Sequence, residues 1–216
     1  MTTDPTIARV DPSDVADPYW IGESIEKGRE TWTRIPSRYA DATADLPEVA
    51  AWVQTLVDIA REQARTVPRI LTGPSLLLVG STGTGKTHQA YGAIRALTVS
   101  GAACSWLSVT AADLYAKLRP RPKVDSEQEF ENVARAGLLV LDDLGAAKGS
   151  EWNEEINYRL VNYRYERELP TLITSNVPPK QLANALGERV ASRLVEMADQ
   201  VVLRGDDRRL AAPGAA

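Results

Sequence analysis

The chain has 216 residues, of which 44% are hydrophobic and 25% are charged, and its formal net charge at pH 7 is −4. This balance is typical of a globular α/β domain, and it excludes a polycation that binds nucleic acid through its overall charge. A disulfide framework is excluded because Cys104 is the single cysteine. The sequence contains no apolar run of membrane-spanning length and no signal peptide, so we expect a cytoplasmic protein without membrane contact.

Residues 1–34 differ in composition from the rest of the chain, because they are rich in Asp and Pro and then in charged residues. We interpret them as an amino-terminal arm with a short helix near 22–33, which is either a partner-binding segment or a partly ordered tail. Residues 35–216 form the second predicted unit, a single ATPase domain. It begins with an amphipathic helix over 46–65, where Val49, Val53 and Leu56 recur at helical spacing.

From residue 68 onward, short apolar runs alternate with helical segments. Four of the runs are nearly continuous in Leu and Val, as in parallel strands that are buried on both faces. The pattern predicts an α/β fold, a doubly wound sheet of five parallel strands flanked by helices. The expected strands are 75–80, 104–109, 137–143, 170–176 and 200–205, and the expected helices are 86–99, 111–118, 127–136, 151–168 and 180–197.

The sequence GSTGTGKT follows the first expected strand and precedes a helix. It matches G-x-x-x-x-G-K-[ST], in which glycines let backbone N–H groups turn toward phosphates and the helix adds its N-terminal dipole. We expect Lys86 to reach the β- and γ-phosphates of ATP and the Thr87 hydroxyl to bind Mg²⁺. The alternative is a glycine-rich turn without nucleotide. The predicted ATP-binding residues of this loop are Gly80, Ser81, Thr82, Gly83, Thr84, Gly85, Lys86 and Thr87.

The segment GLLVLDD ends in two carboxylates at the end of a buried strand, where open α/β sheets bind their ligands. Asp142 is the expected Mg²⁺ partner, and Asp143 is expected to orient or deprotonate an attacking water. This pair favours ATP hydrolysis over a small-molecule kinase, which would not need Asp143. Asn176 ends the strand PTLITSN, where its amide either contacts the γ-phosphate or the water, or caps the turn before two prolines.

Four segments together resemble a known family: LLLVGSTGTGKTHQAYGAI, LLVLDDLG, NYRYERELPTLITSN and LGERVASRL. They are similar to the ATPase domain of DnaC-type bacterial helicase loaders and to the related IstB-type transposase helpers, both in the initiator branch of the AAA+ ATPases. The resemblance spans about residues 35–209. It implies an AAA+ ATPase that forms a homo-oligomer and acts on DNA.

The resemblance assigns roles to two arginines, Arg193 and Arg208. Arg193 in GERVASRL matches the arginine finger that completes the site of a neighbouring subunit, and Arg189 lies one turn earlier on the same helix face. Without the resemblance, both would be interpreted as solvated arginines. Arg208 matches the sensor-two arginine, although Asp207 before it departs from the usual pattern and leaves Arg209 as a substitute. Few residues follow Leu203, so we expect little or no helical lid.

The same resemblance implies contacts with adenine and with DNA. The segment IPSRYADA (35–42) resembles the one beside the adenine, so Tyr39 or Ile35 would pack on the base, or else fasten the first helix to the core. A basic run before the third strand occupies the place where initiator-branch ATPases contact single-stranded DNA, and it is otherwise a solvated loop. Its residues are Lys117, Arg119, Arg121 and Lys123.

We therefore expect a Mg²⁺-dependent ATPase that assembles with itself, binds single-stranded DNA and loads or activates a replicative helicase. One alternative is an IstB-like ATPase that delivers target DNA to a transposase. Another is an ATP-gated binding protein in which turnover is incidental. Residues 1–34 distinguish these possibilities, because a helicase-binding element would lie there.

Overall fold

Five parallel strands form one sheet in the computed structural model, which describes residues 34–146, 150–205 and 207. Their order is β2-β3-β4-β1-β5, and each neighbouring pair is parallel. The predicted five-stranded parallel sheet is confirmed, whereas the arm and helix expected within residues 1–33 lie outside the described residues. The strands are β1 (Ser75–Gly80), β2 (Trp106–Thr110), β3 (Leu138–Leu144), β4 (Thr171–Ser175) and β5 (Ala198–Leu203).

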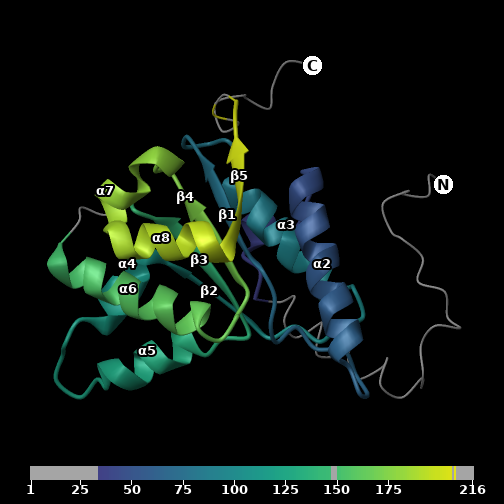
Figure 1. Ribbon diagram of the computed structural model, residues 1–216, viewed down its shortest axis with the longest axis horizontal. Coiled ribbons are helices and arrows are strands. Elements are labelled where there is room, and N and C mark those ends of the chain that lie inside the picture. Colours follow the sequence, from purple (N-terminus) through teal and green to yellow (C-terminus); the bar gives the residue numbers. More distant parts are fainter. Residues whose placement is uncertain (1–33, 147–149, 206, 208–216) are drawn as a thin grey trace, which may run out of the picture.

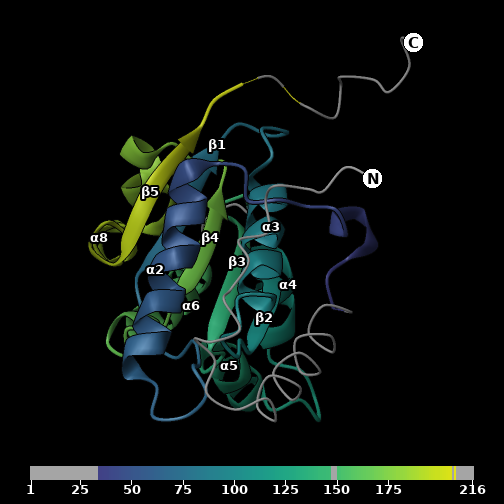
Figure 2. The same cartoon turned by 90° about the vertical axis from the view of Figure 1, so that its right-hand side faces the viewer.

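Helices cover both faces of this sheet, as Figures 1 and 2 show from two directions. One face carries α2 (Pro47–Gln63) and α3 (Lys86–Thr98), and the other carries the later helices. None of the helices in the described part of the chain is long and apolar enough to span a bilayer. The later helices are α4 (Ala111–Leu118), α5 (Ser126–Ala134), α6 (Glu151–Tyr165), α7 (Leu182–Leu186) and α8 (Glu188–Met197), and two short 3-10 turns are η2 (Ser37–Tyr39) and η3 (Pro179–Gln181).

Strand β1 illustrates why the apolar runs were recognisable in the sequence. Leu76 and Leu78 are fully buried against the α2 and α3 face, while Leu77 and Val79 belong to the core on the opposite face. Side chains alternate between the two faces of a strand, so a strand buried on both sides needs apolar residues at every position. The sheet therefore separates two hydrophobic cores.

Most predicted elements have observed bounds within three residues of those expected, and two of the differences concern a backbone break and the position of Cys104. The helix expected over 180–197 is divided into α7 and α8 at Gly187, whose φ of +87° is a conformation that side-chain-bearing residues rarely adopt. Hydrophobic spacing continues across such a break and does not reveal it. The second strand begins at Trp106, so Cys104 lies before it. Cys104 is half-buried against the core, and burial raises the pKa of its thiol to about 12.

The segment before α2 packs closely across α3. The backbone N–H of Thr43 donates to His88 Nε2 at 3.3 Å, and that of Leu46 donates to Gln89 Oε1 at 3.2 Å. At Gly92 a Cβ would lie 2.2 Å from the Thr43 carbonyl carbon, so no larger residue fits. These contacts fasten the segment to α3, the helix that begins at the GSTGTGKT loop.

Arg164, on α6, is a buried cation beside the amino-terminal end of β4, with 1% of its surface exposed. Its guanidinium donates to the Thr171 hydroxyl at 2.7 Å and to the carbonyls of Ala134 (2.9 Å), Ala136 (2.8 Å) and Pro170 (2.8 Å). Burial lowers the pKa of Arg164 to about 9. Carbonyls at the end of α5 carry partial negative charge, which offsets part of that cost. Arg164 thus joins α5 and α6 to the start of β4.

We expect Arg164→Met to lower the free energy of unfolding by about 3 kcal/mol, because three carbonyls and a hydroxyl lose their donor in the interior. Urea unfolding followed by circular dichroism measures the change. Arg167→Met is the matched control, since it removes an exposed guanidinium that lies 3.8 Å from the Tyr163 ring centroid. The control should cost about 1 kcal/mol or less. An Arg164→Met protein as stable as the wild type would mean that desolvation of the guanidinium cancels its hydrogen bonds.

Candidate functional site

The loop between β1 and α3 lies at the carboxyl edge of the sheet, toward which β5 points in Figure 1. Gly85 is the residue before α3 and has φ +98°, a left-handed conformation that turns the chain sharply into the helix. The unpaired N–H groups of the first turn of α3 therefore lie at the loop, where the helix dipole favours an anion. The strand, loop and helix expected around GSTGTGKT are present.

Lys86 is buried in this loop, with 5% of its surface exposed. Its Nζ donates to the carbonyls of Gly80 and Ser81 at 2.9 Å and to Asn176 Oδ1 at 2.6 Å. The structure thus brings together two predicted site residues, Lys86 and Asn176, that are 90 positions apart in the sequence. Its ammonium group lies at the loop, within reach of an anion that would bind there.

Thr87 and Asp142 form the second half of the site. The Thr87 hydroxyl donates to Asp142 at 3.1 Å from Oδ1 and 3.4 Å from Oδ2. Among the described residues, no group of three or more His, Cys, Asp or Glu side chains could hold a metal ion. Mg²⁺ does not need such a group, because it commonly takes one or two protein oxygens and completes its shell with phosphates and water. The two oxygen donors therefore fit Mg²⁺.

The Asp142 carboxyl has a raised pKa, and burial is the largest cause. Hydrogen bonds from Thr174 and Thr87 and the charge of Lys86 lower it, whereas the charge of Asp143 raises it further. The ionised carboxylate is therefore held in an environment that disfavours its charge, as is common where a cation or a reacting group is meant to bind.

Asp143 follows in a left-handed conformation, with φ +56°, and its side chain is exposed. Asn176 Nδ2 donates to Asp143 Oδ1 at 3.4 Å while Asn176 Oδ1 accepts from Lys86. Asn176 therefore links the lysine to the second carboxylate. Through the Thr174 hydroxyl, which bonds both Asp142 and the Asp143 N–H, five of the polar side chains expected at the phosphates lie in one network, namely Lys86, Thr87, Asp142, Asp143 and Asn176.

Sequence reasoning missed two hydroxyls of the same strand. Thr174 donates to Asp142 Oδ1 at 2.5 Å and accepts from the Asp143 backbone N–H at 2.9 Å. Ser175 donates to the Leu144 carbonyl at 2.6 Å. The signal was present in TSN, where three polar residues end a buried apolar strand, but only Asn176 was interpreted.

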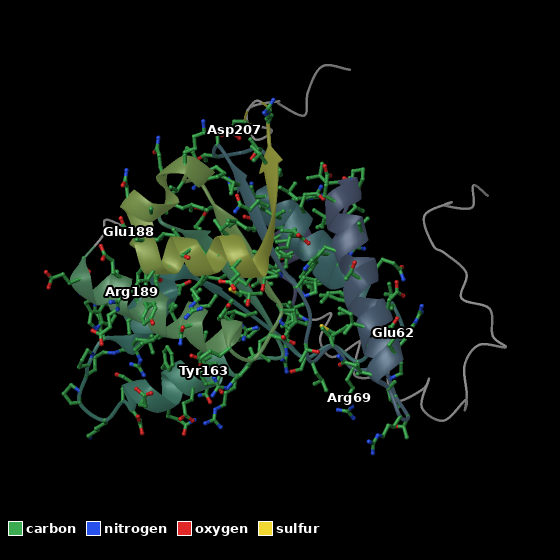
Figure 3. All side chains as sticks on the ribbon, viewed as in Figure 1. Glu62, Arg69, Tyr163, Glu188, Arg189 and Asp207 are labelled. Atoms are coloured by element: carbon green, nitrogen blue, oxygen red, sulfur yellow. The ribbon has the colours of Figure 1, made fainter. Side chains whose placement is uncertain are left out.

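Beyond β5, Asp207 approaches the loop, and Figure 3 labels it at the end of that strand. A Cβ at Gly83 would lie 1.8 Å from Asp207 Oδ1, so this carboxylate rests against the glycine. The sensor-two assignment concerns the following residues, Arg208 and its substitute Arg209, which lie outside the described residues.

Arg189 and Arg193 lie on α8, which packs on α6. The Arg193 Cζ is 4.2 Å from the Tyr165 ring centroid, and the Arg189 Cζ is 5.7 Å from that of Tyr158. Figure 3 shows Arg189 far from Asp207 and hence from the loop that Asp207 touches. In the part of the chain that the structure describes, we find no contact between either arginine and the five-residue network of Lys86, Thr87, Asp142, Asp143 and Asn176.

Tyr39, one of the two residues expected beside adenine, packs on α3. Its ring stacks on Tyr91 of α3, with centroids 4.7 Å apart and an interplanar angle of 18°. The Tyr91 hydroxyl is 3.1 Å from Ser108 Oγ on β2. Tyr39 therefore packs one face of its ring against α3, and contact of the other face with adenine stays a prediction.

The four residues of the predicted DNA surface are exposed around the end of α4 and the following loop. Lys117 and Arg121 line a hollow of about 250 Å³ on one side of α4. Arg119 and Arg121 line a second hollow, of about 560 Å³, that reaches Asn153 at the start of α6. Lys123 lies farther along the same loop.

Curated relatives include the replicative helicase loader DnaC of Escherichia coli (strain K12), which is 28% identical over 123 residues. DnaC of Buchnera aphidicola subsp. Baizongia pistaciae is 31% identical over 124 residues. Each match covers 56% of this chain and 49% or 50% of the relative. The chain thus spans about half the length of the curated relatives it matches.

Solved structures agree on the fold. The crystal structure of the DnaC helicase loader has a TM-score of 0.61 at 24% identity and covers 78% of this chain and 100% of that one. The crystal structure of DnaI has a TM-score of 0.64 at 22% identity and covers 82% of this chain and 95% of that one. DnaA bound to AMPPCP and single-stranded DNA has a TM-score of 0.57 at 23% identity and covers 77% of this chain and 50% of that one. The predicted AAA+ fold is confirmed.

The family model described as IstB-like ATP binding protein matches residues 61–214, which contain the whole network of Lys86, Thr87, Asp142, Asp143 and Asn176. The resemblance inferred from the four sequence segments is therefore confirmed. Because the match covers more than half of the chain, the protein belongs to the family of IstB-like ATP-binding proteins.

Proposed function

We propose that the protein is an ATPase that hydrolyses ATP to ADP and phosphate at the edge formed by β1, β3 and β4. One observation carries this proposal: Asn176 joins Lys86 to Asp143, so the phosphate-binding loop and the carboxylate pair form a single hydrogen-bonded network. A protein that only bound ATP would need the loop, but it would not need a second carboxylate beside the γ-phosphate position. Family membership supports the nucleotide.

In this proposal, Lys86 exchanges its loop carbonyls for the β- and γ-phosphates. Thr87 and Asp142 would hold Mg²⁺, which would neutralise charge on the phosphates. Asp143 accepts a proton from the attacking water or orients it, and Asn176 fixes that carboxylate relative to Lys86. The remaining residues of the loop, Gly80 to Gly85, bind phosphate oxygens through backbone N–H groups.

We further propose that the active form is a homo-oligomer in which Arg193 completes the site of a neighbour. Arg193 stacks on Tyr165 of α6, and Arg189, one turn earlier on α8, lies far from Asp207 and the loop it touches in Figure 3, which supports a finger that acts in trans. An arginine supplied in trans stabilises charge on the transferred phosphoryl and is worth about 10³–10⁵ in rate. Hydrolysis would then depend on assembly.

We propose single-stranded DNA and a replicative helicase as partners. Support for DNA comes from the exposed basic run on the α4–α5 side and from the neighbour DnaA, which binds single-stranded DNA. Support for the helicase comes from relatives that are replicative helicase loaders. These activities belong to the cytoplasm, which is where we propose that the protein acts.

A second candidate function follows from the family description. The family model is described as IstB-like ATP binding protein, and the sequence resembles IstB-type transposase helpers, so the same ATPase would deliver target DNA to a transposase instead of loading a helicase. The two functions share the ATP site, the DNA contact and the assembly, and they differ in the protein partner.

The ATPase proposal predicts complementation between two inactive variants. We expect Lys86→Ala to bind no fluorescent ATP analogue, and Arg193→Ala to bind it normally but to hydrolyse ATP about 10³-fold more slowly with single-stranded DNA present. An equal mixture should recover about a quarter of the wild-type rate, because Lys86→Ala subunits donate fingers to intact Arg193→Ala sites. Arg167→Ala, another arginine stacked on a tyrosine of α6, is the control and should stay active. Full hydrolysis by Arg193→Ala alone would refute the finger.

The raised pKa of Asp142 predicts a conflict between stability and activity. An acid whose pKa is higher in the folded state lowers the free energy of unfolding as the pH rises above its unfolded-state pKa, and the cost is complete once the pH exceeds the folded-state pKa. We expect Asp142→Asn to raise the melting temperature of the nucleotide-free protein by about 2–4 °C and to abolish Mg²⁺-dependent hydrolysis. The gain should shrink toward pH 4. Asp199→Asn, at an exposed position of β5, controls for loss of one charge; an equal gain there would contradict the assignment.

The helicase proposal is tested by a pull-down with the replicative helicase of the same host. The full chain should retain the helicase, and a chain lacking residues 1–34 should lose it if the arm is the attachment segment. Retention by both forms would move the contact to the ATPase domain. If neither form binds the helicase, the loader function is refuted. A pull-down with the transposase then tests the second candidate function.

A further inference from the structure

The pairing of β3 with β4 is irregular at the carboxylates. Leu141 pairs with Ile173 and Leu144 pairs with Ser175, so two residues of β3, Asp142 and Asp143, lie opposite a single residue of β4, Thr174. An extra residue on one strand is the definition of a β-bulge, which bends the strand and re-aims its side chains. The bulge therefore lies at the point where both carboxylates leave the sheet.

At the bulge, the Thr174 side chain makes hydrogen bonds to β3 in place of regular backbone pairing. Its hydroxyl donates to Asp142 Oδ1 at 2.5 Å and accepts from the Asp143 N–H at 2.9 Å. Thr174 is fully buried, so neither bond is exchanged for bulk water. A β-branched side chain in a strand also has few rotamers, which fixes the direction of its hydroxyl.

The bulge has a consequence for the direction of the two carboxylates. In a regular strand, consecutive side chains point to opposite faces, so Asp142 and Asp143 would diverge. Here Asp143 is left-handed, and the two carboxylates reach Thr87 and Asn176 respectively. A left-handed non-glycine residue is disfavoured and persists where its surroundings hold it. The hydrogen bond from its N–H to Thr174 supplies such a restraint.

Ser175 holds the next residue of the bulged strand. Its hydroxyl donates to the Leu144 carbonyl at 2.6 Å and accepts from the Val177 N–H at 3.1 Å. Thr174 and Ser175 thus fix β3 on both sides of Asp143. Only Thr174, however, contacts the carboxylate that faces Thr87.

We propose that Thr174 is a positioning residue for ATP hydrolysis, whose hydroxyl holds the Asp142 carboxylate beside Thr87 and maintains the bulge that aims Asp143 at Asn176. This inference rests on the proposed ATPase function. The hydroxyl acts through Asp142 and Asp143, and it contacts neither nucleotide nor Mg²⁺. Partners of this kind orient metal ligands, and their loss typically lowers metal affinity or activity about 10–100-fold.

Three variants of the full chain separate this role from strand packing. Thr174→Val keeps the shape of the side chain and removes the hydroxyl, while Thr174→Ser keeps the hydroxyl. Thr171→Val removes another buried hydroxyl of β4, one that accepts from Arg164 and lies at the far end of the strand. Thr171→Val should therefore lower the melting temperature without affecting the site.

The first measurement needs no nucleotide. Hydrogen exchange at the Asp143 amide, followed by NMR, reports its bond to Thr174 Oγ1. We expect Thr174→Val to speed this exchange about tenfold or more, and Thr174→Ser and Thr171→Val to leave it near the wild-type rate. Unchanged exchange in Thr174→Val would show that the bulge does not depend on the hydroxyl and would overturn the proposal.

The second measurement is the Mg²⁺ dependence of binding and turnover. In EDTA, all variants should bind a fluorescent ATP analogue within about twofold of the wild type, because the phosphate-binding loop is intact. For Thr174→Val, the Mg²⁺ concentration for half-maximal hydrolysis should rise about tenfold and kcat should fall about 10–100-fold, with KM for ATP little changed. Thr174→Ser should restore both values to within about threefold.

Wild-type Mg²⁺ dependence in Thr174→Val would overturn the proposal, and so would equal losses in Thr174→Ser or Thr171→Val, since these would assign the effect to packing. Failure of the ATPase function is recognised separately. A wild-type protein that binds ATP without hydrolysing it refutes the function, while amide exchange and the Mg²⁺ dependence of analogue binding still decide the role of Thr174.

Discussion

The hydrogen bond from Lys86 Nζ to Asn176 Oδ1, 2.6 Å long, is the contact on which the rest of the site depends. It joins the loop after β1 to the end of β4, and Asn176 extends the connection to Asp143 at the end of β3. This meeting is possible because β3, β4 and β1 are adjacent and parallel, so their carboxyl ends share one edge. The sheet order thus acts as a geometric constraint: chemistry-bearing residues at these three ends are brought within hydrogen-bond distance.

Buried polar groups are treated differently at the two edges of the sheet. Near the amino-terminal end of β4, Arg164 donates to four neutral oxygens and connects three elements, so its cost of burial is offset by structure. At the carboxyl edge, Asp142 stays in surroundings that raise its pKa. A buried charged group whose pKa is shifted against ionisation indicates a site where a ligand binds, whereas a buried group with all its hydrogen bonds made indicates a structural role.

The site network also shows how two hydroxyls refine what the sheet order provides. Parallel pairing brings strand ends together, but a regular strand would direct neighbouring side chains to opposite faces. The bulge at Asp142 and Asp143, with Thr174 opposite both, brings two consecutive carboxylates to the same edge. Elsewhere, α8 packs on α6 and holds Arg189 and Arg193 against the rings of Tyr158 and Tyr165. The chain therefore carries a polar network at the carboxyl edge of the sheet and, apart from it, two arginines of α8 that stack on tyrosines of α6.

The sequence by itself determined the sheet, because strands buried on both faces need continuous apolar runs, and it determined the loop, because glycines and a lysine at fixed spacing follow directly from phosphate binding. It also indicated Asp142, Asp143 and Asn176, since each ends such a run. Tertiary structure alone decided what does not depend on local pattern. The break at Gly187 and the left-handed conformation of Asp143 depend on backbone dihedral angles, which hydrophobic spacing does not reveal. The partner of Tyr39, the role of Thr174 and the four acceptors of Arg164 are contacts between segments distant in sequence, and they exist only once the strands are aligned.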